Sequence, residues 1–301
     1  MKKFLSVLMA GAMLFGVLTL AGCGDTTEPA AEEGTTTEDT ATTAEFTTVT
    51  EGVLTMSTNA AFPPYEMTDD SGKIVGIDAE IAAAIAEKLG LELQIDDMDF
   101  DGALAAPQSG KSDIVMAGVT VNEERQLVLD FSNTYANGVQ KVIVAEGSDI
   151  TMENLGEQQI GTQKGTTGNI LTTDEFGEDH VIAYDDAIAA VQALNNGQID
   201  CVVIDSAVAD NLVEANPGLT TLDTDYANEE YAIGVAKGNT ALLDAINTAL
   251  QELIDDGTVQ SIIDKYIPTD GTAADEAGTT DEAGATDEAG ATDGAEADTA
   301  A

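Results

Sequence analysis

Strand-like and helix-like hydrophobic patterns alternate between residues 51 and 268, and this alternation constrains the fold more than any other feature. Segments 53–57 and 160–163 are strand-like, and 201–204 is a short apolar run typical of a buried strand. Between such runs lie segments with apolar residues every three or four positions, which is typical of amphipathic helices. Strands that alternate with helices favour parallel sheets covered by helices. We therefore predict an α/β fold for this region.

The clearest helical pattern carries Ile81, Ile85 and Leu89, which are four residues apart and so lie on one helix face. Gly90 follows and suits the left-handed conformation that often ends a helix. Asp78 comes just before this pattern, and we expect its side chain to cap the helix N-terminus. Further helices are predicted at 187–194, 241–254 and 259–266.

The first residues have the pattern of an export signal. Lys2 and Lys3 precede an apolar stretch at 4–18, so we predict a signal peptide over 1–22. Residues 20–23 resemble a bacterial lipobox, in which cleavage leaves Cys23 as a lipid-modified N-terminus. The alternative is an ordinary signal peptide with an incidental cysteine.

Two flanking segments, 23–50 and 269–301, are rich in Thr, Ala and acids and contain no base. Such segments cannot bury enough apolar surface to offset the entropy of an ordered chain. We expect a disordered acidic linker before the globular region and a disordered, repetitive acidic tail after it.

The charge balance argues against nucleic-acid binding. The chain has 56 acids, 10 bases and a formal net charge of −46. A nucleic-acid binder needs a basic surface to neutralise phosphates, so we expect no nucleic-acid partner. The chain has one histidine, His180, and one cysteine beyond the signal region, Cys201, which lies in an apolar run. We expect Cys201 to be a buried small hydrophobe, and we expect no metal and no cofactor.

Arg125 is the only arginine in the chain. Its planar guanidinium can grip a carboxylate with two parallel hydrogen bonds, which lysine cannot do. Thr120 lies just upstream and can donate its hydroxyl to the same anion. The alternative is a surface ion pair with Glu123 or Glu124.

Asp205 supplies a complementary charge. It follows the apolar run 201–204 and so lies at the C-terminal end of a predicted strand, where the ligand crevices of α/β sheets open. It can also cap a helix that runs through Val208. The two roles are compatible, because a carboxylate has two oxygens.

An ordered series of motifs resembles solute-binding protein family 3, the extracytoplasmic receptors of polar amino-acid ABC importers. The run 76–81 with Ile85 and Leu89 is similar to the family signature. Ala79 is smaller than the residue usual in the signature, and Pro107 should end a helix early without affecting the pocket. The resemblance continues through 98–100, 117–120, 124–125, 130–132 and 165–168, and it ends near Tyr266.

The resemblance implies a two-lobed periplasmic-binding-protein fold of type II, with mixed, largely parallel sheets flanked by helices. One lobe would hold 51–138 and 228–268, and the other 139–227. Two strand crossovers, near 135–139 and 226–231, would form the hinge.

The resemblance also assigns roles to individual residues. Arg125, Thr120 and Thr167 would bind the ligand carboxylate, and Asp205 with the Gly118 carbonyl would bind its α-ammonium. The remaining positions, which would surround the ligand side chain, are Asn59, Phe62, Phe100 and Gln163. Asn59 and Gln163 are neutral, so we expect a neutral polar amino acid rather than an acidic one. A basic ligand stays open, since Glu66 or the acids around Phe100 could reach inward.

We therefore expect the ligand-capture subunit of an ABC importer, which is not an enzyme. It would be a monomer that binds a free amino acid and delivers it to a permease coupled to an ATPase. Its lipid anchor would hold it at the outer face of the cytoplasmic membrane. One alternative is an enzyme on the same fold similar to cyclohexadienyl dehydratase. Another is the extracellular domain of a sensor, which would need a transmembrane helix that 269–301 does not contain.

Overall fold

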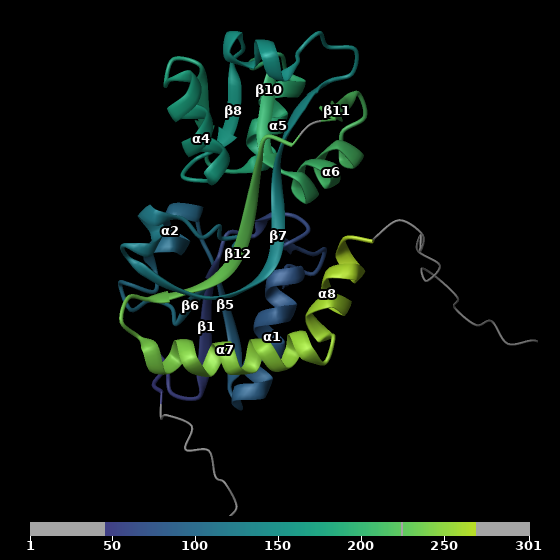
Figure 1. Cartoon of the computed structure of the whole chain (residues 1–301). Coiled ribbons are helices and arrows are strands. Elements are labelled where there is room, and N and C mark those ends of the chain that lie inside the picture. Colours follow the sequence, from purple (N-terminus) through teal and green to yellow (C-terminus); the bar gives the residue numbers. More distant parts are fainter. Residues whose placement is uncertain (1–45, 224, 269–301) are drawn as a thin grey trace, which may run out of the picture. The chain divides into compact units, whose positions relative to one another are not determined.

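The computed structural model describes residues 46–223 and 225–268 (Figure 1). Its main feature is a nine-stranded sheet with the strand order β5-β1-β6-β12-β7-β10-β8-β9, and β11 pairs with β7. Figure 1 shows two groups of helices and strands joined by the long strands β7 (Leu129–Ala145) and β12 (Ala227–Ala236). The two-lobed α/β fold expected from the sequence is confirmed.

Lobe 1 is built around β1 and combines elements from both ends of the described chain. Strand β1 pairs in parallel with both β5 and β6, and a separate three-stranded sheet packs beside them. The strands are β1 (Val53–Thr58), β2 (Ala61–Phe62), β3 (Glu66–Thr68), β4 (Ile74–Val75), β5 (Glu92–Asp97) and β6 (Ile114–Val115). The helices are α1 (Ile77–Leu89), α2 (Phe100–Ala105), α3 (Glu123–Gln126), α7 (Thr240–Asp255) and α8 (Thr258–Tyr266).

Lobe 2 is built around β8, which pairs in parallel with β9 and β10. Its strands are β8 (Ile160–Gln163), β9 (Val181–Tyr184), β10 (Cys201–Asp205) and β11 (Leu219–Thr221). Its helices are the 3-10 helix η1 (Met152–Glu157), α4 (Thr167–Phe176), α5 (Ala187–Asn195) and α6 (Ser206–Ala215).

The crossover strands β7 and β12 pair antiparallel from Leu129 opposite Ala236 to Gln140 opposite Ala227. The register shifts between Tyr231 and Gly234. Such irregularities bend a strand and increase its twist. The predicted hinge segments, 135–139 and 226–231, fall within this ribbon or at its edge. The predicted lobe boundaries themselves stay a prediction.

The periodic helices match the sequence predictions, because their apolar faces are buried. Ile81 and Ile85 in α1 are fully buried, and Gly90 ends the helix at a φ of 70°. The prediction for Asp78 is wrong, since α1 is preceded by Gly76 and has no side-chain cap. Asp78 lies inside the first turn and turns inward, where it accepts hydrogen bonds from the Gly118 amide and the Tyr135 hydroxyl.

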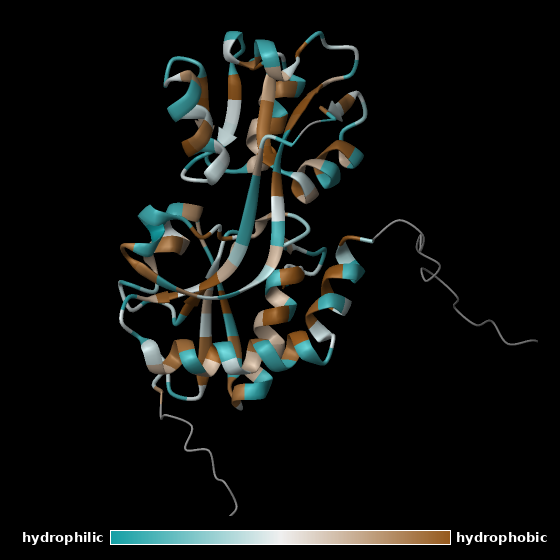
Figure 2. Cartoon of the chain, in the orientation of Figure 1, coloured by the Kyte–Doolittle hydropathy of each residue, from teal (hydrophilic) through white to brown (hydrophobic). Residues whose placement is uncertain are grey.

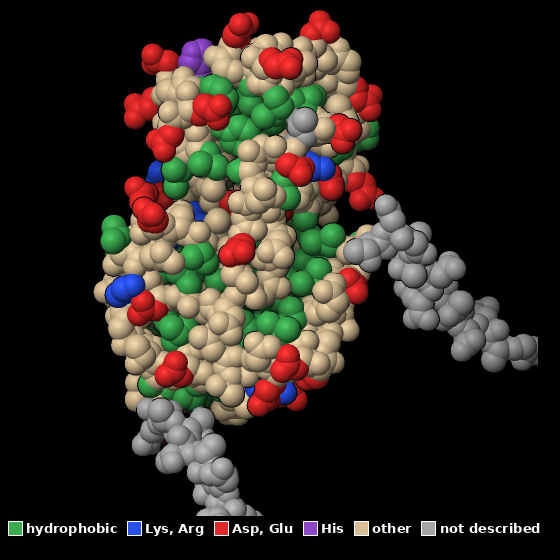
Figure 3. Space-filling model, viewed as in Figure 1, with side chains coloured by type: hydrophobic (Ala, Val, Ile, Leu, Met, Phe, Trp, Pro, Cys, Tyr) green, Lys and Arg blue, Asp and Glu red, His purple; other side chains and the backbone are tan. Residues whose placement is uncertain are grey.

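The core runs along both faces of the sheet. Figure 2 shows hydrophobic brown concentrated within each lobe, on strand segments and helix faces, whereas the crossover strands are largely white to teal between the lobes. Cys201 is fully buried in this core, as expected. Figure 3 shows many acidic side chains scattered over the visible face and few basic ones, in line with the net charge. Within 46–223 and 225–268 no helix is long and apolar enough to span a membrane.

Two local expectations can be compared directly. Helix α2 ends at Ala105, before Pro107, as the proline predicted. The linker predicted over 23–50 overlaps the described residues only at 46–50. There, Phe46 packs against the core and the Val49 amide donates to Asp113. The predicted signal peptide, Cys23 and the acidic tail lie outside the described residues.

Candidate functional site

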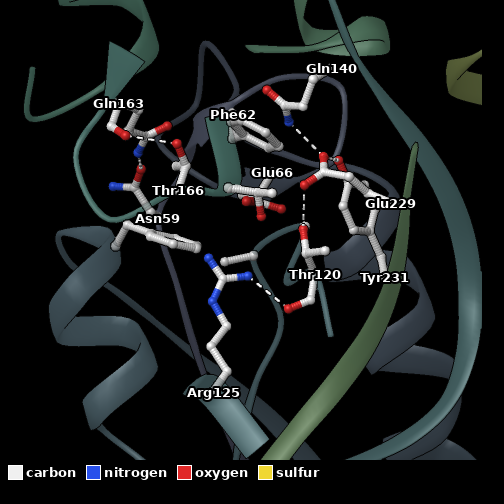
Figure 4. A pocket seen from close by; sticks show the side chains of 14 residues that line it. Asn59, Phe62, Glu66, Thr120, Arg125, Gln140, Gln163, Thr166, Glu229 and Tyr231 are labelled. Carbon is white, nitrogen blue, oxygen red and sulfur yellow. Dashed lines mark hydrogen bonds between the residues drawn. The ribbon is translucent and has the colours of Figure 1, made fainter. Parts of the chain in front are cut away.

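A small, narrow cavity lies between the two lobes (Figure 4). It opens just beyond the carboxyl ends of β1, β6 and β8, the edge of a parallel sheet where α/β proteins bind ligands. Lobe 1 contributes Asn59, Phe62, Glu66, Phe100, Ala117, Gly118, Thr120 and Arg125. Lobe 2 and the crossover strands contribute Gln140, Gln163, Thr166, Thr167, Glu229 and Tyr231. Every predicted ligand-binding residue except Asp205 therefore lines one cavity.

Arg125 projects into the cavity from α3 (Figure 4). Asn122 caps this short helix by accepting from the Arg125 amide at 2.8 Å. The guanidinium donates to the carbonyls of Thr120, at 2.8 Å, and Gly165, at 3.2 Å, and it lies over the Phe100 ring. Arg125 is only 7% exposed, and burial lowers the pKa of its guanidinium. The surface ion pair considered from the sequence is wrong, because the side chain is buried among backbone carbonyls.

Because α3 is a single turn, its dipole adds little to anion binding. The second lobe offers a longer helix, α4, which begins at Thr167 and is capped by Thr166. The Thr167 side-chain oxygen is buried and has no hydrogen-bond partner among the described residues. An unpaired hydroxyl beside the first turn of α4 suits an incoming anion.

Glu229 lies across the cavity and is held by three neutral donors. It accepts from the Thr120 hydroxyl at 2.8 Å, the Gln140 amide at 2.5 Å and the Tyr231 hydroxyl at 3.1 Å. The side chain is 4% exposed. The Thr120 hydroxyl, expected to face a ligand carboxylate, thus donates to Glu229 in this structure.

Asp205 lies directly behind Tyr231 at the end of β10. One oxygen accepts from the Ala207 and Val208 amides and so caps α6, and the other accepts from the Tyr231 hydroxyl at 2.8 Å. The side chain is fully buried, and burial raises its pKa to about 6. The capping role is confirmed, and the role toward an ammonium group stays a prediction.

Contacts between the lobes close one side of the cavity. The Gln163 amide donates to the Asn59 side chain at 2.8 Å, and the Asn59 amide donates to the Met98 carbonyl. Nearby, Lys164 and Asp101 form an ion pair at 2.7 Å. The lobes therefore meet through polar side chains at the rim.

Comparison with known proteins now identifies the family. Residues 54–269 match the profile described as bacterial extracellular solute-binding proteins, family 3. The chain belongs to this family. The chain is 30% identical to a probable histidine-binding protein of Neisseria gonorrhoeae over 91% of its own length and 98% of the relative's. It is 31% identical to the L-cystine-binding protein TcyJ of Escherichia coli K12, over 73% and 85% of the two chains.

Solved structures agree with this assignment. An ancestral arginine-binding protein bound to glutamine is 39% identical, with a TM-score of 0.70, over 73% of this chain and all of that one. The holo ArgBP of T. maritima is 38% identical, with a TM-score of 0.65, over 70% and 95% of the two chains. These family 3 proteins are named for binding and not for catalysis. The dehydratase-like alternative therefore gains no support.

Sequence analysis missed Gln140, Glu229 and Tyr231 and left Glu66 open. Glu229 and Tyr231 are two residues apart on β12, so they lie on one face of that strand. The alternation of residues along this strand could have indicated that both side chains face the cavity. Gln140 could not be found in this way, because its place beside Glu229 depends on the pairing of β7 with β12, which are distant in sequence.

Proposed function

We propose that this family 3 protein is the ligand-capture subunit of an ABC importer. It binds a free amino acid between its lobes and delivers it to a membrane permease and, through it, to an ATPase. One observation carries the proposal: a buried arginine and buried carboxylates meet at one inter-lobe cavity. An α-amino acid carries a positive ammonium and a negative carboxylate on the same carbon atom, so it complements such a cavity.

The ligand's carboxylate is assigned to Arg125 and to the start of α4 at Thr167. A guanidinium fork and exposed helix amides both favour a carboxylate. The ligand's α-ammonium is assigned to Asp205 with the Gly118 carbonyl, and Glu229 and Tyr231 lie between Asp205 and the cavity. The aromatic rings of Phe62 and Phe100 would enclose the side chain. Contacts from both lobes would hold the closed form together.

The predicted signal peptide and lipobox-like residues determine where we place the protein in the cell. We propose that the mature chain begins at a lipid-modified Cys23 and stays at the outer face of the cytoplasmic membrane as a monomer. Stable attachment needs more than one acyl chain, which a bacterial lipid anchor supplies. If fractionation leaves a Cys23→Ala variant with the membrane, the anchor is elsewhere.

A thermal-shift screen of the natural amino acids tests the function. A ligand at 100 times its Kd stabilises the native state by about 2.7 kcal/mol, which for a domain of this size raises Tm by at least about 5 °C. We expect a small set of polar amino acids to do so. The matched control is the amide of the same amino acid, which lacks the carboxylate and should give no shift. If no amino acid raises Tm, the proposed function is wrong.

A further inference from the structure

Glu66 is a fully buried carboxyl group in the cavity wall that receives no hydrogen bond. It begins β3, opposite Phe62 of β2, and Figure 4 shows it near the centre of the lining side chains. None of the described residues donates to either of its oxygens. The segment is held rigidly against α1, because the Asp78 amide donates to the Tyr65 carbonyl at 3.0 Å.

The other buried carboxylates at this place are all satisfied. Asp78 accepts from the Gly118 amide at 2.9 Å and from the Tyr135 hydroxyl at 2.7 Å. Asp205 accepts from two amides and a hydroxyl, and Glu229 accepts from three side chains. Within residues 46–223 and 225–268, Glu66 is the one buried carboxyl group of this cluster without a donor. A buried, ionised and unpaired carboxylate is strongly unfavourable, so this group needs either a proton or a cationic partner.

The charges that surround Glu66 are mostly negative. Asp78 of α1, Asp97 of β5 and Asp205 of β10 all act on it, and Glu229 of β12 lines the same cavity. Arg125 is the only basic side chain in the wall, and the carboxylate that acts on it most strongly is Glu229. Within the described part of the chain, no lysine or arginine forms an ion pair with any of these buried carboxylates.

A proton on Glu66 removes the repulsion between its carboxylate and the surrounding negative charges. Burial and then the neighbouring Asp78 raise the pKa of Glu66 well above its usual value. The protonated Glu66 can donate to Asp78, which in turn favours the ionised form of Asp78. The pair then carries one negative charge, and that charge is held by the donors of Asp78. The second oxygen of Glu66 stays available to the cavity.

We propose that Glu66 carries this proton in the ligand-free protein and releases it to solvent when an amino acid with a cationic side chain enters the cavity. The N–H groups of the incoming side chain then donate hydrogen bonds to the ionised Glu66. One positive charge enters as one proton leaves, so the charge of the cavity is unchanged. The inference rests on the proposed function and narrows its ligand to the basic class, instead of the neutral polar class expected from the sequence.

Glu66 then acts as a specificity residue whose preference depends on pH. A neutral side chain can bind beside protonated Glu66 without any proton release. A basic side chain needs the ionised form, so its affinity falls as pH falls below the pKa of Glu66 in the free protein. In that range, the affinity for a basic ligand should fall about tenfold per pH unit, and the affinity for a neutral one should change little.

L-arginine and L-citrulline are the probes, because they differ only in a guanidinium or a neutral ureido group. Each is titrated calorimetrically into the purified protein near neutral pH, in two buffers of different ionisation enthalpy. The buffer dependence of the heat gives the number of protons released. We expect about one proton per L-arginine bound and almost none per L-citrulline. L-arginine binding without proton release would overturn the proposal.

Glu66→Gln provides a second test with a nearly isosteric side chain. We expect it to abolish proton release, to weaken L-arginine binding by at least about tenfold and to leave L-citrulline binding almost unchanged. The control is Glu80→Gln, since Glu80 lies on α1 outside the cavity and pairs with Lys265. If Glu66→Gln keeps the preference for L-arginine, the assignment is wrong. If the wild-type protein binds L-citrulline or L-glutamine but not L-arginine, this inference fails and the proposed function stands. If no amino acid binds, both fail.

Discussion

At the scale of single residues, Arg125 shows how composition and burial together mark a functional group. It is the only arginine in a chain with few bases, and it is almost completely buried. Its guanidinium donates to two carbonyls, one from each lobe, and has further N–H groups for a ligand. Its uniqueness was visible in the sequence, but its contact with Gly165 was not, because that contact joins residues from different lobes.

Arg125→Lys should keep the positive charge but lose the planar fork. We expect ligand binding to weaken by about 1.5–3 kcal/mol, the contribution of hydrogen bonds to a charged group. Calorimetric titration with the amino acid found by the screen measures this loss. Lys265→Arg, which changes a base far from the cavity, should bind like the wild type. Equal affinities for Arg125→Lys and the wild type would remove Arg125 from the site.

At the scale of elements, the predictable parts were those set by local periodicity. Helix α1 and strands β1 and β10 follow from their own apolar residues, and β8 was placed by its strand-like segment between helical ones. The length of β7 does not, because Ser132, Asn133 and Asn137 interrupt its pattern and the strand is held by pairing with β12. Asp78 was misjudged for a related reason. The partners that turn it inward, Gly118 and Tyr135, are distant in sequence.

The start of α1 offers a test of how tightly Glu66 is positioned. A Cβ atom on Gly76 would lie 2.2 Å from the Tyr65 carbonyl oxygen, and its φ is 132°. Gly76→Ala should therefore lower the free energy of unfolding by about 3 kcal/mol. Gly72→Ala is the matched control, since its φ is also positive but no atom lies within 4 Å. It should cost only about 1 kcal/mol. Equal losses in denaturant unfolding would show that the contact with Tyr65 is not tight.

At the scale of the whole molecule, the strands that connect the lobes also line the cavity. Strands β7 and β12 are the sheet's continuous path between the lobes, and both supply cavity residues, Gln140 from one and Glu229 and Tyr231 from the other. Closure of the lobes, as we propose it, would therefore move the elements that bind the ligand. A zwitterion held by Arg125 from lobe 1 and by Asp205 and Thr167 from lobe 2 would favour the closed arrangement, because only that arrangement allows all of these contacts.

Small-angle X-ray scattering, with and without a saturating amino acid, tests this account most directly. We expect the radius of gyration of the wild-type protein to fall when the ligand is added. We expect no such fall for Asp205→Asn, which keeps the cap of α6 but removes the charge assigned to the α-ammonium. A wild-type protein that binds the amino acid, as shown by calorimetry on the same sample, yet keeps its radius of gyration would contradict capture between closing lobes.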